Sequence, residues 1–416
     1  MNYSEAIEYI HSINWTFCKP GLERIKILLD KLNNPQDSLK FVHVAGTNGK
    51  GSFCKMLQQA LTLSGYKTGL FTSPYIKVFN ERMQISGQMI DNDELALITE
   101  YVRPFADEMD DKPTEFELIT AIAMEYFNRH NCDIVVLETG MGGRLDSTNI
   151  ITTSVLSVIT GVALDHTQFL GNTVEEIAKE KAGIIKPFVP VLFGGKDKSA
   201  EKIISDVAKE HSSPFYSIDY SNLLIKKMTI EGTVFDYNNY SDIKLCLLGE
   251  YQPENASLVL KASEILVKQG FEISENALRK AFLTVYWPAR FEVLKTSPLV
   301  IFDGAHNPQG IEVCIKSIKT YFNRQKVLVM TGVLKDKDYF YIAKKLAEIT
   351  DTALIFTPEN PRALKKEDYA VVLKENGINA ITFETIKDAY SFGLKEANEK
   401  NMPLIILGSL YTYSFI

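Results

Sequence analysis

From residue 41 onwards, short apolar runs alternate with segments whose apolar residues recur at helical spacing. The runs "FVHVAG", "YKTGLFTS", "CDIVVLETG", "SVLSVITGV" and "VPVLFG" have the length and β-branched content of buried strands. Two of the helical segments between them begin with a threonine and a glutamate at capping-box spacing, Thr114 with Glu117 and Thr173 with Glu176. This alternation predicts a mostly parallel sheet covered by helices.

The pattern changes twice further along the chain. Residues 216–248 combine β-branched and aromatic residues with turn signals, which predicts a small antiparallel section. After two more helical segments, the runs "LVIFDG", "KVLVMTG", "TALIFT", "NAITF" and "PLIILGS" predict a second α/β unit. We expect a linker at Trp287–Pro298, and we divide the chain into residues 1–290 and 291–416.

Length and composition narrow the function classes. A chain of 416 residues exceeds the roughly 250–300 residues that one hydrophobic core supports, which is consistent with two domains. A net charge of −7 without a basic stripe argues against nucleic-acid binding, and no apolar run is long enough to span a membrane. The polar, acidic start does not resemble a secretory signal, and the five cysteines are scattered singly, so we expect a cytoplasmic protein.

The segment "GTNGKGS" after the first predicted strand resembles a phosphate-binding loop but departs from the pattern G-x-x-x-x-G-K-[ST]. Val44 stands where the first glycine belongs, and Gly51 separates Lys50 from Ser52. The physical requirements are still met, because a strand delivers the glycines, Lys50 supplies a cation and a helix follows. The segment therefore predicts phosphate binding; the alternative is a glycine-rich turn without a ligand.

Polar residues also follow other predicted strands. Glu138 ends "CDIVVLE", at the edge where open α/β sheets bind ligands, and can serve as a magnesium ligand or be merely a solvated glutamate. Asp165 and His166 follow the next strand, although a lone histidine is more often structural. Lys181, near the end of a helix, ordinarily would complement the helix dipole. The glycine-rich run after Glu138 predicts a loop near the substrate.

In the second unit, "LVIFDGAHNPQG" places Asp303 and His306 after a strand. Two polar groups in that position suggest half of a site shared between domains, and the alternative is a turn with a capping aspartate. Asn307 and Pro308 suit the start of the next helix.

Taken together, these residues resemble the folylpolyglutamate synthase and dihydrofolate synthase family of the Mur ligase superfamily. The motifs that carry the resemblance run in family order from residue 46 to 411: "GTNGKGS", "FTSP", "ERMQISG", "TEFELITAIA", "ETGMGGRLDSTN", "LDHTQFLGNTVEEIAKEKAGIIK", "GEYQPENA", "PARFEVL", "DGAHNP" and "GSLY". The resemblance implies an α/β fold, in which a P-loop domain with a mostly parallel sheet and a small antiparallel section precedes a smaller Rossmann-like domain, with the active site in the cleft between them. It also implies that ATP phosphorylates the carboxylate of a folate or dihydropteroate, and that the amine of L-glutamate attacks the acyl phosphate.

The resemblance further implies a role for individual residues. Those expected to hold ATP are Gly46, Thr47, Asn48, Gly49, Lys50, Gly51, Ser52, Asn255, Arg290, Asp303 and His306. Those expected around two Mg²⁺ ions are Ser52, Ser73, Glu138, His166 and Lys181, the last as a carbamate formed with CO₂. Those expected near the pterin or glutamate are Arg82, Thr114, Phe116, Arg144 and Ser409. The catalytic set implied in this way is Lys50, His166, Lys181, Asp303 and His306.

Three positions depart from the family pattern: Tyr75 and Tyr251 replace histidines, and Ala289 replaces a glycine. Two other classes stay open. A P-loop ATPase switch or kinase would release or transfer phosphate independently of glutamate. A cell-wall Mur ligase would carry an additional N-terminal domain, whereas only about 40 residues precede the loop here. We expect a monomer, and the motifs do not distinguish dihydropteroate from folates as the substrate.

Overall fold

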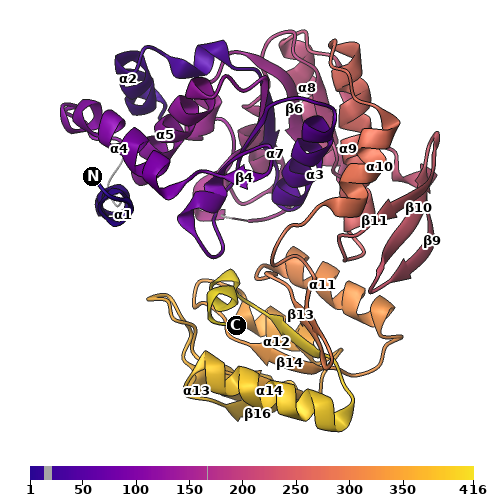
Figure 1. Cartoon of the computed structure of the whole chain (residues 1–416). Coiled ribbons are helices and arrows are strands. Elements are labelled where there is room, and N and C mark those ends of the chain that lie inside the picture. Colours follow the sequence, from indigo (N-terminus) through magenta and orange to yellow (C-terminus); the bar gives the residue numbers. More distant parts are fainter. Residues whose placement is uncertain (14–20, 166) are drawn as a thin grey trace. The chain divides into compact units, whose positions relative to one another are not determined.

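The computed structural model describes residues 1–13, 21–165 and 167–416. Their contacts divide the chain into two compact units, residues 1–221 with 254–285 and residues 222–253 with 286–416. Figure 1 shows the chain coloured from the indigo N-terminus to the yellow C-terminus.

The described part of the first unit contains an eight-stranded sheet in the order β4-β3-β2-β5-β1-β6-β7-β8. Its strands are β1 (Phe41–Ala45), β2 (Thr68–Phe71), β3 (Met83–Ile85), β4 (Gln88–Met89), β5 (Ile134–Glu138), β6 (Ser154–Ile159), β7 (Val191–Phe193) and β8 (Phe215–Ser217). The six strands from β2 to β8 in this order pair in parallel, and β3 and β4 add an antiparallel edge. The predicted, mostly parallel sheet is therefore confirmed.

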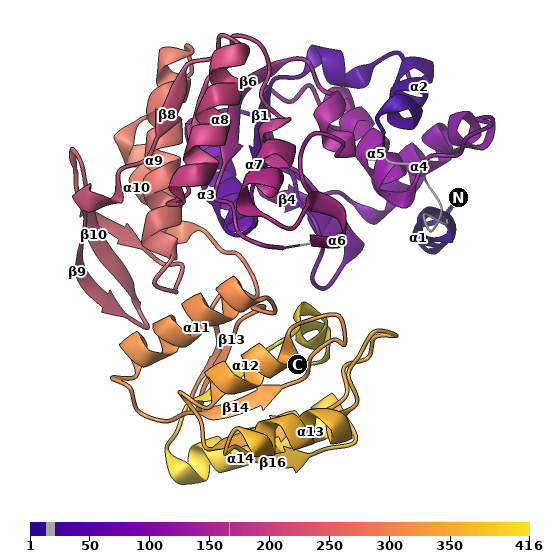
Figure 2. The same ribbon diagram turned by 180° about the vertical axis from the view of Figure 1, so that it is seen from behind.

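Helices cover both faces of this sheet, as a buried parallel sheet requires. Helices α3, α9 and α10 lie on the side seen in Figure 1, whereas α7 and α8 lie on the side seen in Figure 2. The α-helices with residues in this unit are α1 (Tyr3–Ser12), α2 (Glu23–Lys31), α3 (Lys50–Leu63), α4 (Asn92–Asp107), α5 (Glu115–Arg129), α6 (Thr167–Leu170), α7 (Val174–Ala182), α8 (Lys198–Glu210), α9 (Gln252–Lys268) and α10 (Glu275–Thr284). Short 3₁₀ turns are η1 (Pro35–Ser38), η2 (Phe79–Arg82), η3 (Ser147–Ile150) and η4 (Tyr220–Asn222).

The starts of α5 and α7 have the predicted capping boxes. The Thr114 hydroxyl accepts the Glu117 amide at 3.2 Å, while the Glu117 carboxylate accepts the Thr114 amide at 2.6 Å. Thr173 and Glu176 form the same reciprocal pair, with both distances 3.2 Å. These side chains satisfy amide groups that have no partner within the helix, and so they define where α5 and α7 begin.

The register of the central strands brings their carboxyl ends to one edge of the sheet. Val44 of β1 lies opposite Glu138 of β5 on one side and Val158 of β6 on the other. The loops that follow β1, β5 and β6 therefore leave the sheet at the same edge, where open α/β sheets bind ligands.

The described part of the second unit contains a six-stranded sheet in the order β12-β13-β17-β14-β15-β16 and a three-stranded antiparallel sheet in the order β11-β10-β9. Its strands are β9 (Leu223–Thr229), β10 (Gly232–Tyr237), β11 (Tyr240–Leu245), β12 (Glu292–Thr296), β13 (Leu299–Phe302), β14 (Leu328–Thr331), β15 (Thr352–Ile355), β16 (Asn379–Thr382) and β17 (Leu404–Leu407). Its helices are α11 (Pro308–Tyr321), α12 (Tyr339–Leu346), α13 (Lys366–Glu375), α14 (Ile386–Lys400) and η5 (Leu410–Phe415). The second α/β unit and the antiparallel section are both as predicted.

The predicted linker at Trp287–Pro298 is partly wrong. Glu292–Thr296 form the edge strand β12, which pairs antiparallel with β13. An edge strand tolerates the charged residues of this segment because one of its sides faces no neighbouring strand. The division at residue 290 stays a prediction: the chain passes between the contact-defined units at Val285–Tyr286, and residues 222–253 group with the second unit.

Two further findings concern composition. Within the described part of the chain, no helix combines the length and apolar character needed to cross a membrane. The described cysteines, Cys54, Cys132, Cys246 and Cys314, are all free thiols.

The segment around Arg290 has an unusual backbone. Ala289 and Phe291 both lie in the left-handed region, with φ of 56° and 48°. The Ala289 amide donates to the Glu292 carboxylate at 2.8 Å, and the Phe291 amide donates to Asp303 at 2.9 Å. A left-handed conformation costs a non-glycine residue about 1–2 kcal/mol, so these carboxylates hold a strained segment in place.

Replacing Ala289→Gly should relieve part of this strain. We expect the free energy of unfolding to rise by about 0.5–1 kcal/mol, since glycine adopts a positive φ freely but also gains freedom in the unfolded chain. Urea titration would measure the change. The control Ala281→Gly, inside α10, should instead lower stability by about 1 kcal/mol or more. If Ala289→Gly were less stable than the wild type, the claim that Ala289 is strained would be contradicted.

Candidate active site

The loop between β1 and α3 is closely packed against two neighbouring side chains. A Cβ atom on Gly46 would lie 2.0 Å from the Thr160 hydroxyl oxygen, and one on Gly49 would lie 2.7 Å from Asn255 Oδ1. Gly49 also has φ of 84°, which glycine adopts without strain. Both glycines are thus required by the geometry, and Asn255 lies beside the loop whose ligand it is predicted to share.

Three polar groups determine the conformation of the same loop. Lys50 Nζ donates to the carbonyl oxygens of Gly46 at 3.0 Å and Thr47 at 3.4 Å, so the ammonium lies over the loop. The Thr47 hydroxyl bonds to both backbone groups of Ala163, at 3.0 and 3.2 Å. The Thr160 hydroxyl donates to the Asn48 carbonyl at 2.7 Å. The loop is therefore tied to the segment that follows β6 and leads to Asp165.

The predicted magnesium ligands include oxygen donors of the kind that Mg²⁺ prefers. Ser52 is buried in the first turn of α3, and Glu138 is buried at the end of β5. Ser73 lies in the loop after β2, and His166 lies outside the described residues. Among the residues the structure describes, no group of three or more His, Cys, Asp or Glu side chains could hold a metal ion. A magnesium site here would need other donors as well, such as hydroxyls, phosphates, water or a modified lysine.

Among the cations at this edge of the sheet, Lys181 has the most strongly shifted pKa. It lies near the end of α7 with only 3% of its surface exposed. Burial lowers the pKa of its amine from 10.5 to about 7, and repulsion from Lys50 contributes, while Asp165 and Asp146 act in the opposite direction. A lysine that merely complements a helix dipole needs no such burial, so the structure favours a specific role for this amine.

The loop after β5 packs along the end of α7, next to Lys181. The Arg144 amide donates to the Glu180 carbonyl at 2.7 Å, and its guanidinium pairs with the Glu180 carboxylate at 2.9 Å. The Asn149 side chain donates to the Gly183 carbonyl at 2.9 Å. The predicted substrate residue Arg144 is therefore half-exposed and already ion-paired.

Asp146 in this loop was not among the predicted site residues. It is buried and accepts the Met141 amide at 2.8 Å and the Thr148 amide at 3.1 Å, while burial raises the pKa of its carboxyl group. Its position in the motif "GGRLDSTN" could have marked Asp146 as a site residue. The sequence alone does not show, however, that its carboxylate bonds back to the glycine-rich run.

Phe116 packs against the glycine-rich loop and β2, whereas Arg82 lies next to the loop that follows β2. A Cβ atom on Gly140 would lie 2.6 Å from the Phe116 ring, which also contacts Phe71 at 5.9 Å between centroids. The Arg82 guanidinium lies over the rings of Tyr75 and Phe79, at 5.1 and 5.6 Å. Its Nε and Nη1 are buried without a hydrogen-bond partner, and burial lowers its pKa. Thr114, by contrast, is engaged as the helix cap.

In the second unit, Asp303 follows β13 and is held by three donors. Its carboxylate accepts the amides of Phe291 at 2.9 Å and Ala305 at 2.8 Å, and the Tyr251 hydroxyl at 3.2 Å. Burial raises the pKa of Asp303, and Arg290 opposes that rise. Tyr251, which replaces the usual histidine, thus donates a hydrogen bond to Asp303, a residue predicted to contact ATP.

The remaining predicted residues of this unit lie in irregular segments next to the strands: Arg290 before β12, His306 after β13 and Ser409 after β17. Arg290 Nη1 donates to the Ala289 carbonyl at 3.1 Å, and His306 Nδ1 lies 2.7 Å from the Gly304 carbonyl. Ser409 is buried after β17, the parallel neighbour of β13, and its hydroxyl accepts the Tyr411 amide at 3.3 Å. The carboxyl ends of β13 and β17 therefore bring Asp303 and Ser409 to one edge.

Two family models match the chain. The Mur ligase middle domain matches residues 44–263, and the glutamate ligase domain of the Mur ligases matches residues 289–410. The first match covers more than half of the chain and includes the phosphate loop and Lys181. The protein is therefore a ligase of the Mur ligase type.

Curated relatives narrow the family. The dihydrofolate synthase/folylpolyglutamate synthase of Bacillus subtilis is 36% identical over 425 residues, covering 100% of this chain and 98% of the relative. The folylpolyglutamate synthase of Lacticaseibacillus casei is 36% identical over 430 residues, with the same coverage of 100% and 98%. The chain belongs to the folylpolyglutamate synthase/dihydrofolate synthase family.

Solved structures agree with this assignment. A Mycobacterium tuberculosis folylpolyglutamate synthase complexed with ADP and AMPPCP has a TM-score of 0.90 at 29% identity, covering 99% of this chain and 98% of its own. A folylpolyglutamate synthase–AMPPCP–folate complex has a TM-score of 0.86 at 34% identity, with coverage of 100% and 98%. An Escherichia coli relative in complex with DHPP and ADP has a TM-score of 0.86 at 29% identity, with coverage of 100% and 96%. The predicted fold class and family are confirmed.

The burial of Lys181 should make stability depend on pH. Because its folded pKa of about 7 lies below the ordinary 10.5, the unfolded chain holds more protons between these values, and stability rises with pH through this window. Replacing Lys181→Met should therefore raise the free energy of unfolding most at pH 6.5, and the gain should shrink towards pH 9.5. Urea titration in CO₂-free buffer would measure it.

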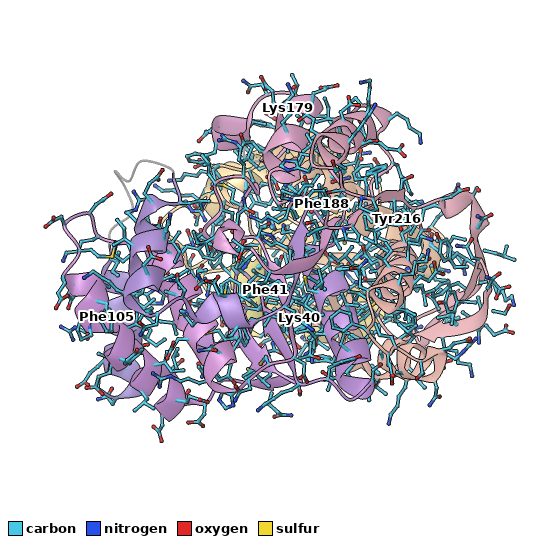
Figure 3. All side chains as sticks on the ribbon, turned by 90° about the horizontal axis from the view of Figure 1, so that it is seen from above. Lys40, Phe41, Phe105, Lys179, Phe188 and Tyr216 are labelled. Atoms are coloured by element: carbon cyan, nitrogen blue, oxygen red, sulfur yellow. The ribbon has the colours of Figure 1, made fainter. Side chains whose placement is uncertain are left out.

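Lys179 on the same helix provides the control. Its side chain is exposed to solvent, and Figure 3 labels the residue near the top of the view. Lys179→Met should therefore show no comparable gain in the free energy of unfolding. If Lys181→Met raised the free energy of unfolding equally at pH 6.5 and pH 9.5, the claim that burial lowers the pKa of Lys181 would be contradicted.

Proposed function

We propose that this protein adds L-glutamate to the carboxylate of a folate, of dihydropteroate, or of both, through an acyl phosphate made from ATP. The observation that carries the proposal is the end-to-end similarity to synthases named for these two reactions. The complexes of related structures with folate, DHPP, ADP and AMPPCP support the same choice of substrates.

The chemistry needs an activated carboxylate, because a carboxylate by itself is a poor electrophile. A substrate carboxylate oxygen attacks the γ-phosphorus of ATP, and the bond to ADP breaks. The glutamate amine then attacks the acyl carbon, inorganic phosphate leaves, and the nitrogen loses a proton. Lys50 and the amides of the Gly46–Ser52 loop suit the developing phosphate charge, because the loop is packed and tied before the substrate binds.

Magnesium, when bound, would neutralise part of the phosphate charge and draw the reacting oxygens together. The residues proposed to hold it are Ser52, Ser73, Glu138 and Lys181, with His166 outside the described residues. Lys181 would contribute as a carbamate: its unprotonated amine attacks CO₂, a proton is released, and the product carries two oxygen donors. The lowered pKa supports this step, since about half of the amine is unprotonated near pH 7.

Other assignments stay proposals. Asn255, Arg290, Asp303 and His306 are proposed to contact ATP, and Ser409 is proposed to lie near glutamate. Thr114 and Arg144 are proposed as substrate residues, with Thr114 also capping a helix and Arg144 also paired with Glu180. A cytoplasmic location and a monomeric state are likewise proposals.

A direct assay tests the reaction class. Incubation with ATP, Mg²⁺, L-glutamate and either tetrahydrofolate or dihydropteroate should release phosphate and yield a product heavier by one glutamate, measured by mass spectrometry. Running the two pterins side by side distinguishes one activity from two. Phosphate release that needs no glutamate would instead favour an ATPase switch or a kinase.

A second test concerns the carbamate. Replacing Lys181→Ala should reduce the ligation rate by about 100-fold or more, because an oxygen donor of the metal site is lost. Small carboxylic acids such as acetate should restore part of the rate, whereas chloride at equal ionic strength should not. Full activity of Lys181→Ala would rule out the carbamate.

A further inference from the structure

Glu81 holds the loop that follows β2. Its carboxylate accepts three consecutive backbone amides, from Ile76 at 2.7 Å, Lys77 at 2.7 Å and Val78 at 2.9 Å. The carboxylate is largely buried, with 9% of the residue exposed. The loop from residue 72 to 78 has no regular secondary structure, and these three charge-assisted hydrogen bonds contribute to its order.

The backbone around Glu81 has separate support. Its carbonyl accepts the Gln84 side chain at 3.0 Å, and Gln84 in turn accepts Lys55 Nζ of α3 at 2.9 Å. The Thr72 amide donates to the Arg82 carbonyl at 3.0 Å, which extends the pairing of β2 with β3. Changing the Glu81 carboxylate should therefore loosen the loop without removing the turn that carries Arg82.

The loop in turn supplies part of the surroundings of Arg82. Tyr75, in the loop, and Phe79, at its end, both contact the Arg82 guanidinium. Although Glu81 is its sequence neighbour, Glu81 directs its carboxylate to the loop amides, and two nitrogens of Arg82 stay unpaired. A buried guanidinium with unpaired N–H groups is costly unless a ligand completes it.

We propose that Glu81 is a positioning residue for the pterin-bearing substrate, which it serves by holding Tyr75 over Arg82 and leaving the Arg82 nitrogens available to that substrate. The proposal rests on the proposed function, because it assumes that Arg82 meets the substrate. Glu81 itself touches no reacting atom.

Replacing Glu81→Gln tests this role. The amide is nearly the same size, but it lacks the charge and turns N–H donors towards the loop amides. We expect the KM for the pterin substrate to rise about tenfold or more, as for loss of charge-assisted hydrogen bonds. The dissociation constant for ADP should change less than about twofold when it is measured without Mg²⁺, because the phosphate loop is supported separately and Ser73, a proposed magnesium ligand in the loosened loop, is then not involved. Val78→Ala, an exposed side chain of the same loop, is the matched control and should leave the KM within about twofold of the wild type.

Two further measurements separate positioning from general destabilisation. In a double-mutant cycle, Glu81→Gln and Tyr75→Ala should raise the KM by less together than the product of their separate effects, since both act through Arg82. Hydrogen exchange followed by mass spectrometry should show faster exchange of the residue 73–79 amides in Glu81→Gln, with unchanged exchange in α3.

The outcomes are distinguishable. A wild-type protein that ligates glutamate to neither pterin overturns the proposed function, whereas hydrogen exchange still tests the loop. An active wild type whose KM is unchanged by Glu81→Gln overturns the positioning role. Three other results would also overturn the positioning role. They are independent effects of Glu81→Gln and Tyr75→Ala on the KM, a loss of ADP affinity in Glu81→Gln as large as the rise in KM, and unchanged hydrogen exchange of the residue 73–79 amides.

Discussion

The parallel register of β1, β5 and β6 is the constraint on which the site in the first unit depends. Because Val44 lies between Glu138 and Val158, the loops after these three strands emerge at one edge of the sheet. Residues more than a hundred positions apart in the chain, such as Thr47 and Ala163, can then hydrogen-bond directly. The phosphate loop is consequently held by its neighbours as much as by its own sequence.

A second physical theme is the desolvation of cations. Lys181 and Arg82 are both largely buried, and burial lowers the pKa of each. The consequences differ because the chemistry of the two groups differs. An amine with a pKa of about 7 can lose its proton and react, whereas a guanidinium keeps its charge and can only bind. Burial thus suits Lys181 for covalent modification and Arg82 for recognition.

Carboxylates, in turn, order the backbone of several irregular loops. Glu81, Asp146, Glu292 and Asp303 each accept backbone amides from loops that carry predicted site residues. In the second unit this includes the left-handed segment around Arg290, where alanine stands in place of the family's glycine. In both units, carboxylates that accept backbone amides therefore hold irregular loops next to predicted site residues.

The sequence by itself determined the main alternation of strands and helices, the capping boxes and the glycine-rich turn between β1 and α3, because these depend on local periodicity and on contacts a few residues apart. It did not predict the short strands β3, β4 and β8. It also determined the family, since the motifs extend over nearly the whole chain. Tertiary structure alone decided that Lys181 is desolvated and that Arg144 is already paired with Glu180. It likewise decided that Glu81 turns towards the loop amides and that Glu292–Thr296 form a strand and not a linker. Burial and pairing depend on residues distant in the chain, and local pattern carries no information about which of them meet.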